Sequence, residues 1–254
     1  MRKPLLLAVV ALVALTLLAA GVARPWTAIN RSGELIIGTE GQFPPFNYFD
    51  ERNQLVGFEI DIGNALARAL GLRPVWRTGA FDTLLVGLQQ DLYDIVIASF
   101  AITAERGQIV DFSIPHYRSG GIVVTLPGGP RTAAELRGKT VGVQVATTYA
   151  EAVERVAGVG RINTYRTDPE ALQELLNGRV DAWVTDRFVA LEAIAGNPQA
   201  RLVTGDLLFT EEIAVAVGKG NRQLLDNVNL ALQTIFKDGT YDRISRERFG
   251  ASIR

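Results

Sequence analysis

The sequence contains no cysteine and only one histidine, His116, among its 254 residues. The absence of cysteine excludes disulfide bonds, a thiol nucleophile, thiolate metal sites and a lipid-modified cysteine at the end of a leader. A single histidine excludes a histidine-rich zinc cluster, and a Ser-His-Asp triad would have to use His116. We name no metal ligands and expect no cofactor.

The sequence also has no marked excess of positive or negative charge. The formal net charge is −1, and it becomes −3 if Arg2 and Lys3 are removed with a leader. Acidic and basic residues are interspersed, so nothing in the sequence indicates the basic surface typical of nucleic-acid-binding proteins, and we expect no nucleic-acid partner. Apolar residues make up 48% of the chain, which is enough to bury a sizeable core in one large or two ordinary domains.

The long apolar run of the sequence is confined to its start. A basic beginning is followed by an almost wholly apolar stretch at residues 5–20, and small residues stand at Gly21 and Ala23. This pattern predicts a secretory signal peptide, residues 1–23, cut after Ala23. The alternative is an uncleaved membrane anchor, because residues 5–22 approach the length of a bilayer span.

Short apolar runs alternate with helical patterns through the rest of the chain. We expect strands near residues 33–39, 75–77, 94–98, 122–126, 141–145, 162–165, 182–184, 201–203 and 213–217. Expected helices cover residues 57–70, 83–90, 147–157, 169–177, 187–194, 221–236 and 241–249, with Asp82 as the N-cap of the second. The alternation predicts an α/β fold in which helices pack on a mostly parallel sheet.

The alternation falls into two units. The C-terminal helices have no strands of their own within the second unit to pack on. We therefore infer that the chain crosses back to the first unit. The predicted first lobe comprises residues 24–115 and 213–254, and the second comprises residues 121–209. Two crossings, residues 116–120 and 210–212, would form a hinge.

One stretch combines several features of an anion site. The apolar run 94–98 is followed by Ser99 and then by Thr103, a suitable N-cap for a helix that would contain Arg106. Helix N-termini and the two-pronged guanidinium both suit a carboxylate. An arginine on a solvated first turn is the alternative from this stretch alone. A loop with two consecutive prolines, residues 40–46, leaves the first strand at a position where open α/β sheets often carry ligand contacts.

With these motifs in place, the chain resembles the periplasmic amino-acid-binding proteins of ABC importers, known as solute-binding protein family 3. The resemblance extends from about Gly33 to Gly250 and is most specific at the sequence GFEIDI, residues 57–62. Further matching segments are residues 43–46, 103–106, 111–113, 136–143, 178–182 and 238–241. The resemblance implies the two-lobed type II periplasmic-binding-protein fold and lobe closure around a free amino acid.

The resemblance also implies roles for individual residues. Arg106 would clamp the ligand carboxylate, helped by the Ala101 N–H and by N–H groups of the helix that begins near Thr147 and Thr148. The ligand ammonium would be held by the Ser99 carbonyl and by Asp186. A threonine is common in the family where Ala101 stands, so one hydroxyl contact is missing in this chain.

Ligand specificity would come from Glu40, Phe43, Phe81, Gln144 and Thr185, with Arg118 as a further candidate. Phe43 and Phe81 would enclose the aliphatic part of the ligand, although ordinary core packing would also explain them. A carboxylate at Glu40 favours Arg, Lys, His or Gln as ligand, because an aliphatic side chain would leave Glu40 without a partner. A solvated loop acid is the alternative at that position.

Two alternative hypotheses for the function stay open, an enzyme and a receptor domain. An exported enzyme on the same fold, such as a small carboxylic-acid dehydratase, would need an acid or base in the cleft, and Glu40, Asp186 and His116 are the candidates. The ligand-sensing domain of a receptor would need a membrane span and an output domain after Arg254. In the favoured reading the protein is a periplasmic monomer without enzymatic activity, and its partners are the amino-acid ligand and ABC transporter permease subunits.

Overall fold

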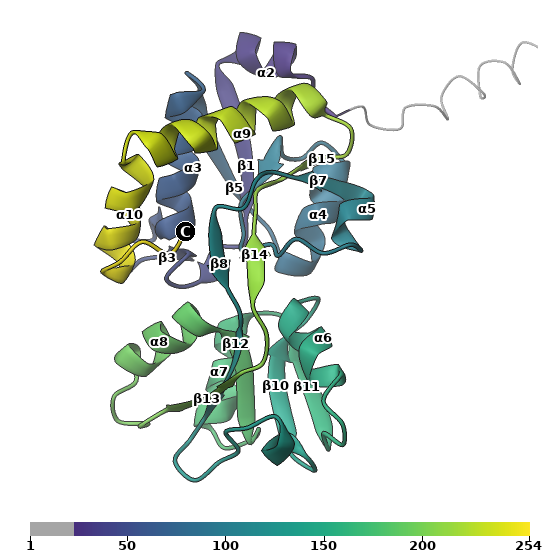
Figure 1. Ribbon diagram of the computed structural model, residues 1–254, viewed down its shortest axis with the longest axis vertical. Coiled ribbons are helices and arrows are strands. Elements are labelled where there is room, and N and C mark those ends of the chain that lie inside the picture. Colours follow the sequence, from purple (N-terminus) through teal and green to yellow (C-terminus); the bar gives the residue numbers. More distant parts are fainter. Residues whose placement is uncertain (1–22) are drawn as a thin grey trace, which may run out of the picture.

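The computed structural model describes residues 23–254. The predicted leader, residues 1–23, therefore lies outside the described residues except for Ala23. The described chain forms two lobes, one above the other in Figure 1. We call the lobe that contains the N-terminal strand the first lobe.

Each lobe is built on a five-stranded sheet. The first-lobe sheet has the order β5 (Arg73–Thr78), β1 (Glu34–Thr39), β6 (Ile95–Val96), β15 (Ala216–Gly218), β7 (Val110–Phe112). The second-lobe sheet has the order β11 (Arg161–Tyr165), β10 (Thr140–Gln144), β12 (Ala182–Asp186), β9 (Gly121–Thr125), β13 (Val203–Leu207). A small sheet of β2 (Gln42–Phe43), β3 (Asn47–Phe49) and β4 (Leu55–Val56) lies beside the first.

One strand in each sheet runs against the others. In the first lobe β1 is parallel to β5 and β6, whereas β15 is antiparallel to β6 and β7. In the second lobe β10 is parallel to β11 and β12, whereas β9 is antiparallel to β12 and β13. The reversed strand is in both cases the one by which the chain enters the lobe from the other. The predicted α/β fold with mostly parallel sheets is confirmed, and the reversed strands are an addition to it.

Two extended segments connect the lobes. They contain β8 (Tyr117–Ser119) and β14 (Glu211–Ile213), which pair in antiparallel fashion between the two sheets (Figure 1). The predicted hinge segments, residues 116–120 and 210–212, overlap these strands. The boundaries of the lobes and of the hinge stay predictions, because they are defined by how the units move relative to one another.

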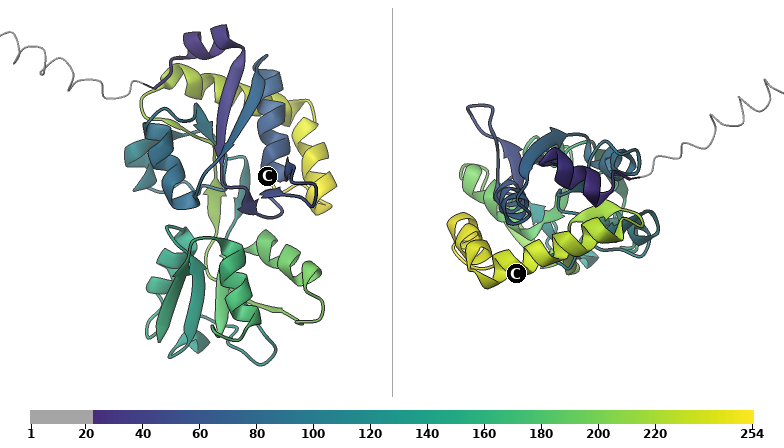
Figure 2. Two further views of the ribbon diagram at one scale, coloured as in Figure 1. Left: turned by 180° about the vertical axis from the view of Figure 1, so that it is seen from behind. Right: turned by 90° about the horizontal axis from the view of Figure 1, so that it is seen from above.

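The C-terminal helices belong to the first lobe. There α3 (Phe58–Ala69), α9 (Arg222–Lys237) and α10 (Thr240–Phe249) pack against one another, and α4 (Phe81–Gln89) packs on β1, β6 and β15. Figure 2 shows α9 and α10 along one side of this lobe in the view from above. The second lobe carries α6 (Thr148–Glu154), α7 (Asp168–Leu176) and α8 (Arg187–Gly196). The short elements are α2 (Trp26–Ser32), α5 (Arg106–Ile109) and the 3-10 turn η1 (Ala134–Leu136).

The buried positions explain why these elements form. In α3, Phe58, Ile62 and Leu66 are fully buried at helical spacing, and in β1 Leu35 and Ile37 alternate with less buried residues. These periodicities turn one face of each element toward the shared core. The core thereby fixes the carboxyl ends of β1 and β6 at the side of the first lobe that faces the second.

Local details differ from the sequence-based expectations. Helix α4 begins at Phe81 with Ala80 as N-cap, so the prediction of Asp82 as N-cap is wrong. The single strand expected at 213–217 is divided into β14 and β15, because the chain first pairs with β8 between the lobes and then enters the first sheet. Residues 40–56, expected as a loop and a turn, contain the small sheet.

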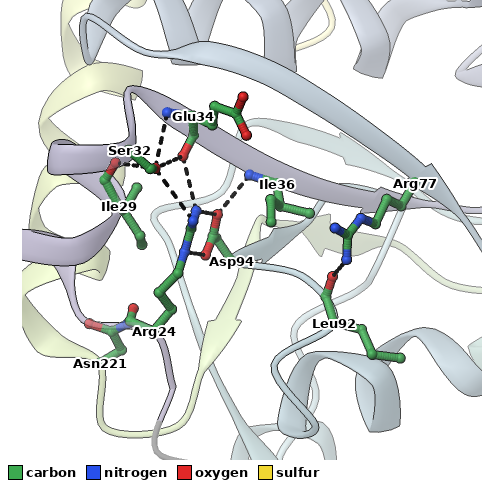
Figure 3. Close-up of polar contacts among 9 residues, drawn as sticks. All are labelled: Arg24, Ile29, Ser32, Glu34, Ile36, Arg77, Leu92, Asp94 and Asn221. Carbon is green, nitrogen blue, oxygen red and sulfur yellow. Dashed lines mark hydrogen bonds and ion pairs between the residues drawn. The ribbon is translucent and has the colours of Figure 1, made fainter.

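A polar contact holds the N-terminal segment to the first lobe (Figure 3). Arg24 Nε donates to Asp94 Oδ1 at 2.7 Å, and Arg24 also forms an ion pair with Asp94 Oδ2. The same guanidinium donates to the Glu34 carbonyl at 3.0 Å, and Asp94 Oδ2 accepts from Ile36 N at 2.7 Å. The Asp94 side chain is only 2% exposed. Arg24 therefore compensates a buried carboxylate next to the start of β1.

We expect Arg24→Ala to lower the melting temperature by several degrees, because Asp94 would remain buried without its cation. An unsatisfied buried group costs about 1–3 kcal/mol, and each kcal/mol corresponds to roughly 2–4 °C in a protein of this size. Arg31→Ala, in the exposed end of α2, is the matched control. Differential scanning calorimetry of both variants checks this, and equal melting temperatures for the two would contradict it.

Candidate functional site

A small cavity lies between the two lobes. The centre of a water-sized sphere can occupy only about 10 Å³ of it, and the space between its walls, open solvent included, is about 280 Å³. Its walls come from both lobes and include every predicted site residue except Ala101, Thr185 and Asp186. The lining residues are Glu40, Phe43, Phe81, Ala98, Ser99, Arg106, Gln144, Thr147, Thr148 and Tyr149.

Arg106 reaches from the first lobe toward the second. Its guanidinium donates to the Ala101 carbonyl at 3.2 Å and, across the cleft, to the Ala146 carbonyl at 3.0 Å. Thr103 Oγ1 accepts from Arg106 N at 3.1 Å, but α5 begins at Arg106 with Glu105 as its N-cap, so the prediction of Thr103 as N-cap is wrong. Burial lowers the pKa of the Arg106 guanidinium from its ordinary value. Enclosing this cation is therefore unfavourable unless an anion is enclosed with it.

Aromatic rings support the guanidinium. Phe81 and Phe100 stack with ring centroids 4.5 Å apart, and Arg106 Cζ lies 5.0 Å from the Phe100 centroid and 5.8 Å from that of Phe81. These distances are within the range of cation–π attraction. Phe43 lines the same cavity and stacks on Phe46 at 5.8 Å. Phe43 and Phe81 thus serve both core packing and the cavity wall.

Glu40 is the acidic group of the cavity. It follows β1, is only 6% exposed, and accepts a hydrogen bond from Gln144 Nε2 of the second lobe at 2.6 Å. Burial raises the pKa of Glu40 from 4.5 to about 8, and Asp168, Glu59 and Asp82 add smaller repulsions against the hydrogen bond that lowers it. Within residues 23–254 no ion pair joins Glu40 to Arg106. The cavity therefore contains a cation and a carboxyl group that are both destabilised by burial.

The second lobe contributes the start of α6. Thr147 is its N-cap: Thr147 Oγ1 accepts from Ala150 N at 3.1 Å and donates to the Gln144 carbonyl at 2.7 Å. Thr148 Oγ1 donates to Glu211 of β14 at 2.7 Å. The cavity-facing end of α6 is thereby bonded to one of the two connecting segments.

Three predicted residues and Arg118 lie outside the lining. Ala101 pairs with Ile213 at the edge of a wider opening, where Arg118 also lies, paired with Glu212. Thr185 Oγ1 donates to Asp168 Oδ2 at 2.7 Å. Asp186 caps α8 by accepting from Phe188 N at 2.7 Å, and its other oxygen accepts from the Tyr149 hydroxyl at 3.4 Å.

The lobes are closed on each other. Besides the Glu40–Gln144 and Arg106–Ala146 hydrogen bonds, Phe188 of α8 packs on Phe46 and on Phe249 of the first lobe, at 6.2 and 5.0 Å. No cluster of three potential metal-ligating side chains is found among residues 23–254. Over the same residues, no helix is long and apolar enough to cross a membrane.

Two sheets joined by two crossings, with a cavity between them that residues of both lobes line, define a two-lobed ligand-binding protein. The family model for bacterial extracellular solute-binding proteins, family 3, matches residues 35–251. The chain belongs to this family. The L-cystine-binding protein TcyJ of Escherichia coli K12 is 36% identical over 229 residues, which cover 89% of this chain and 86% of the relative.

Solved structures agree with this assignment. An ancestral arginine-binding protein, solved with arginine bound, is 42% identical, and the match has a TM-score of 0.83 and covers 86% of this chain and 99% of that chain. An ancestral arginine-binding protein was also solved with glutamine bound. The ancestral amino acid-binding protein AncCDT-1, described as a precursor of cyclohexadienyl dehydratase, is 32% identical, with a TM-score of 0.80 and coverage of 88% of this chain and 98% of that chain.

We expect the ligand-free protein to lose thermal stability as the pH rises from about 5 to about 8. The Glu40 carboxyl ionises near pH 4.5 when exposed but stays protonated up to about pH 8 in the folded protein. The folded state therefore holds more protons in this range, so raising the pH favours unfolding.

Glu40→Gln removes this contribution, and melting temperatures recorded across the pH range for both proteins check it. Asp168 and Asp186, whose pKa values burial raises to about 7, add a decline of the same sign to both proteins. The variant should therefore show a shallower decline than the parent. Parallel curves would show that Glu40 is not protonated in the folded state.

Proposed function

We propose that this chain is an extracytoplasmic binding protein that captures a free amino acid between its closing lobes and delivers it to an ABC permease. Arg, Lys, His and Gln are the favoured ligands. The observation that carries this proposal is the pair of separated groups in one cavity, the half-buried Arg106 and the buried Glu40. A zwitterion with a basic side chain brings an anion to the first and a cation to the second.

Each ligand group has proposed partners. The carboxylate binds Arg106, the Ala101 N–H and the start of α6 at Thr147 and Thr148. The charge-assisted hydrogen bonds involved contribute about 1.5–3 kcal/mol each. The ammonium group binds the Ser99 carbonyl and Asp186. Because the Tyr149 hydroxyl contacts Asp186, the ligand must displace that hydroxyl to reach the carboxylate.

The side chain of the ligand is assigned to Glu40, Phe43, Phe81, Gln144 and Thr185. A guanidinium or ammonium group at Glu40 would offset the desolvation of the carboxylate. A glutamine side chain could instead bond to Gln144 and to a protonated Glu40. The structures solved with arginine and with glutamine bound support two members of this range, whereas the relative TcyJ is named for L-cystine, which lies outside it.

The remaining parts of the proposal concern the molecule as a whole. The lobes, residues 24–115 with 213–254 and residues 121–209, turn about the segments 116–120 and 210–212. The protein acts as a periplasmic monomer after cleavage near Ala23, and it performs no chemistry on its ligand. The relatives named as binding proteins support the last point, and His116, one of the three acid or base candidates, does not line the cavity.

A thermal-shift screen of residues 24–254 against the twenty amino acids and L-cystine tests the ligand class. A ligand at 100 times its dissociation constant adds about 2.7 kcal/mol of stability. We expect the largest shifts for basic amino acids and none for leucine or glutamate. Recovering the ligand unchanged after prolonged incubation checks the absence of chemistry. The proposal is falsified if no amino acid shifts a preparation that was first unfolded and refolded to remove bound ligand.

Two substitutions test the assigned contacts by isothermal titration calorimetry. Arg106→Ala should weaken binding of every amino-acid ligand by at least about tenfold, because the carboxylate is common to all of them. Glu40→Gln should weaken L-arginine by about 10- to 100-fold and L-glutamine much less. Arg155→Ala, an exposed arginine at the end of α6, is the control and should leave affinity unchanged.

The outcomes separate the two assignments. Unchanged affinity in Arg106→Ala would mean that the carboxylate is held elsewhere. Equal losses for arginine and glutamine in Glu40→Gln would mean that Glu40 does not select the side chain.

A further inference from the structure

Another buried carboxylate, Glu59, lies behind the cavity wall rather than in it. Glu59 is the second residue of α3 and is 0% exposed. Its nearest basic side chain is His116, whose Nε2 lies 3.7 Å from Glu59 Oε1, beyond hydrogen-bond distance. A buried carboxylate without a close cation is strongly unfavourable unless several donors compensate it.

The compensating donors come from the turn after β6. Glu59 Oε1 accepts from Ser99 N at 2.7 Å, and Glu59 Oε2 accepts from Ser99 Oγ at 3.2 Å. Ser99 lines the cavity and has a φ of 54°, a left-handed conformation that is uncommon for residues other than glycine. The two hydrogen bonds hold the backbone in this conformation, at the point where the chain turns from β6 toward Arg106.

A third donor connects Glu59 to the loop after β1. Asn47 Nδ2 donates to Glu59 Oε2 at 2.8 Å, and Asn47 Oδ1 accepts from Gly41 N at 2.7 Å. Gly41 directly follows Glu40, the acidic group of the cavity. One side chain therefore restrains both first-lobe segments that supply polar groups to the site, although it does not line the cavity itself.

We propose that Glu59 is a positioning residue, which holds Ser99 and, through Asn47, the Glu40 loop in the geometry that binds the ligand. The part of this proposal that concerns affinity depends on the proposed function. The part that concerns the two backbone segments does not. The chain contains a matched acidic control, Asp61, which lies two residues further along α3 and pairs with Arg248 at the surface.

The test is an exchange of the two polar side chains. Glu59→Gln alone places an amide N–H against the N–H donors of Asn47 and Ser99. We expect L-arginine affinity to fall by about 10- to 100-fold. Asn47→Asp alone places two carboxylates in contact and should weaken binding at least as much.

The double variant, Glu59→Gln with Asn47→Asp, restores complementary partners. The amide introduced on α3 would donate to the carboxylate introduced on β3, and its oxygen would accept from Ser99 N. The introduced carboxylate would also accept from Gly41 N. We therefore expect the affinity of the double variant for L-arginine to return to within about threefold of the parent.

Amide hydrogen exchange measured by NMR on the ligand-free protein provides a readout that needs no ligand. We expect the amides of Gly41 and Ser99 to exchange at least about tenfold faster in Glu59→Gln and to be protected again in the double variant. Asp61→Asn should change neither exchange at these amides nor L-arginine affinity. Unchanged exchange at both amides in a folded Glu59→Gln, or no recovery in a folded double variant, would overturn the proposal.

The two proposals fail separately. If the parent does not bind L-arginine or any other amino acid, the proposed function is wrong and the exchange rates still decide the role of Glu59. If neither Glu59→Gln nor the double variant folds, Asn47→Ala is measured instead. The positioning role then requires faster amide exchange at Gly41 while the Ser99 amide stays protected. Any other exchange pattern rejects the role.

Discussion

Desolvation of the Arg106 guanidinium and of the Glu40 carboxyl group between the lobes is the constraint on which the site depends. Closing two lobes over Arg106 and Glu40 removes water from both, and neither forms an ion pair within the described protein. Coulomb attraction in a dry cavity is far stronger than in water, so a ligand of matching charges stabilises the closed form much more than the open form. Selectivity then depends on closure as well as on contact, because a ligand that leaves either group unpaired disfavours the closed state.

Three of the predicted site residues that line the cavity lie at or shortly after the ends of strands. Glu40 follows β1, Ser99 lies beyond β6, and Gln144 ends β10, and the carboxyl ends of parallel strands meet at one edge of a sheet. That rule needs only the order of the elements. It also predicts Thr185 and Asp186 at the end of β12, where the structure shows side chains bonded to Asp168 and to the start of α8. Sequence alone does not specify the packing that decides which side chains at a strand end face the cleft.

Tyr149 and Ala98 line the cavity without having been predicted. Both lie within or directly beside regular elements, in patterns that also describe core residues, so nothing local distinguishes them. The same limit applies to the apolar run at residues 213–217, which contains the last residue of β14 and the first two residues of β15. Their division arises because Ile213 pairs with Tyr117 between the lobes, whereas Ala216 pairs with residues of the first sheet. Boundaries of this kind depend on contacts between distant segments.

The position of Arg24 has a consequence for how the molecule can be attached to a surface. Arg24 is fastened beside the amino end of β1, whereas the cavity begins at the carboxyl end of that strand, at Glu40. A strand of this length separates the two ends by about 15–20 Å. A tether joined to the chain at Arg24 would therefore leave the mouth of the cleft and both connecting segments free. Capture and release would work alike for a freely diffusing molecule and for one held at its N-terminus.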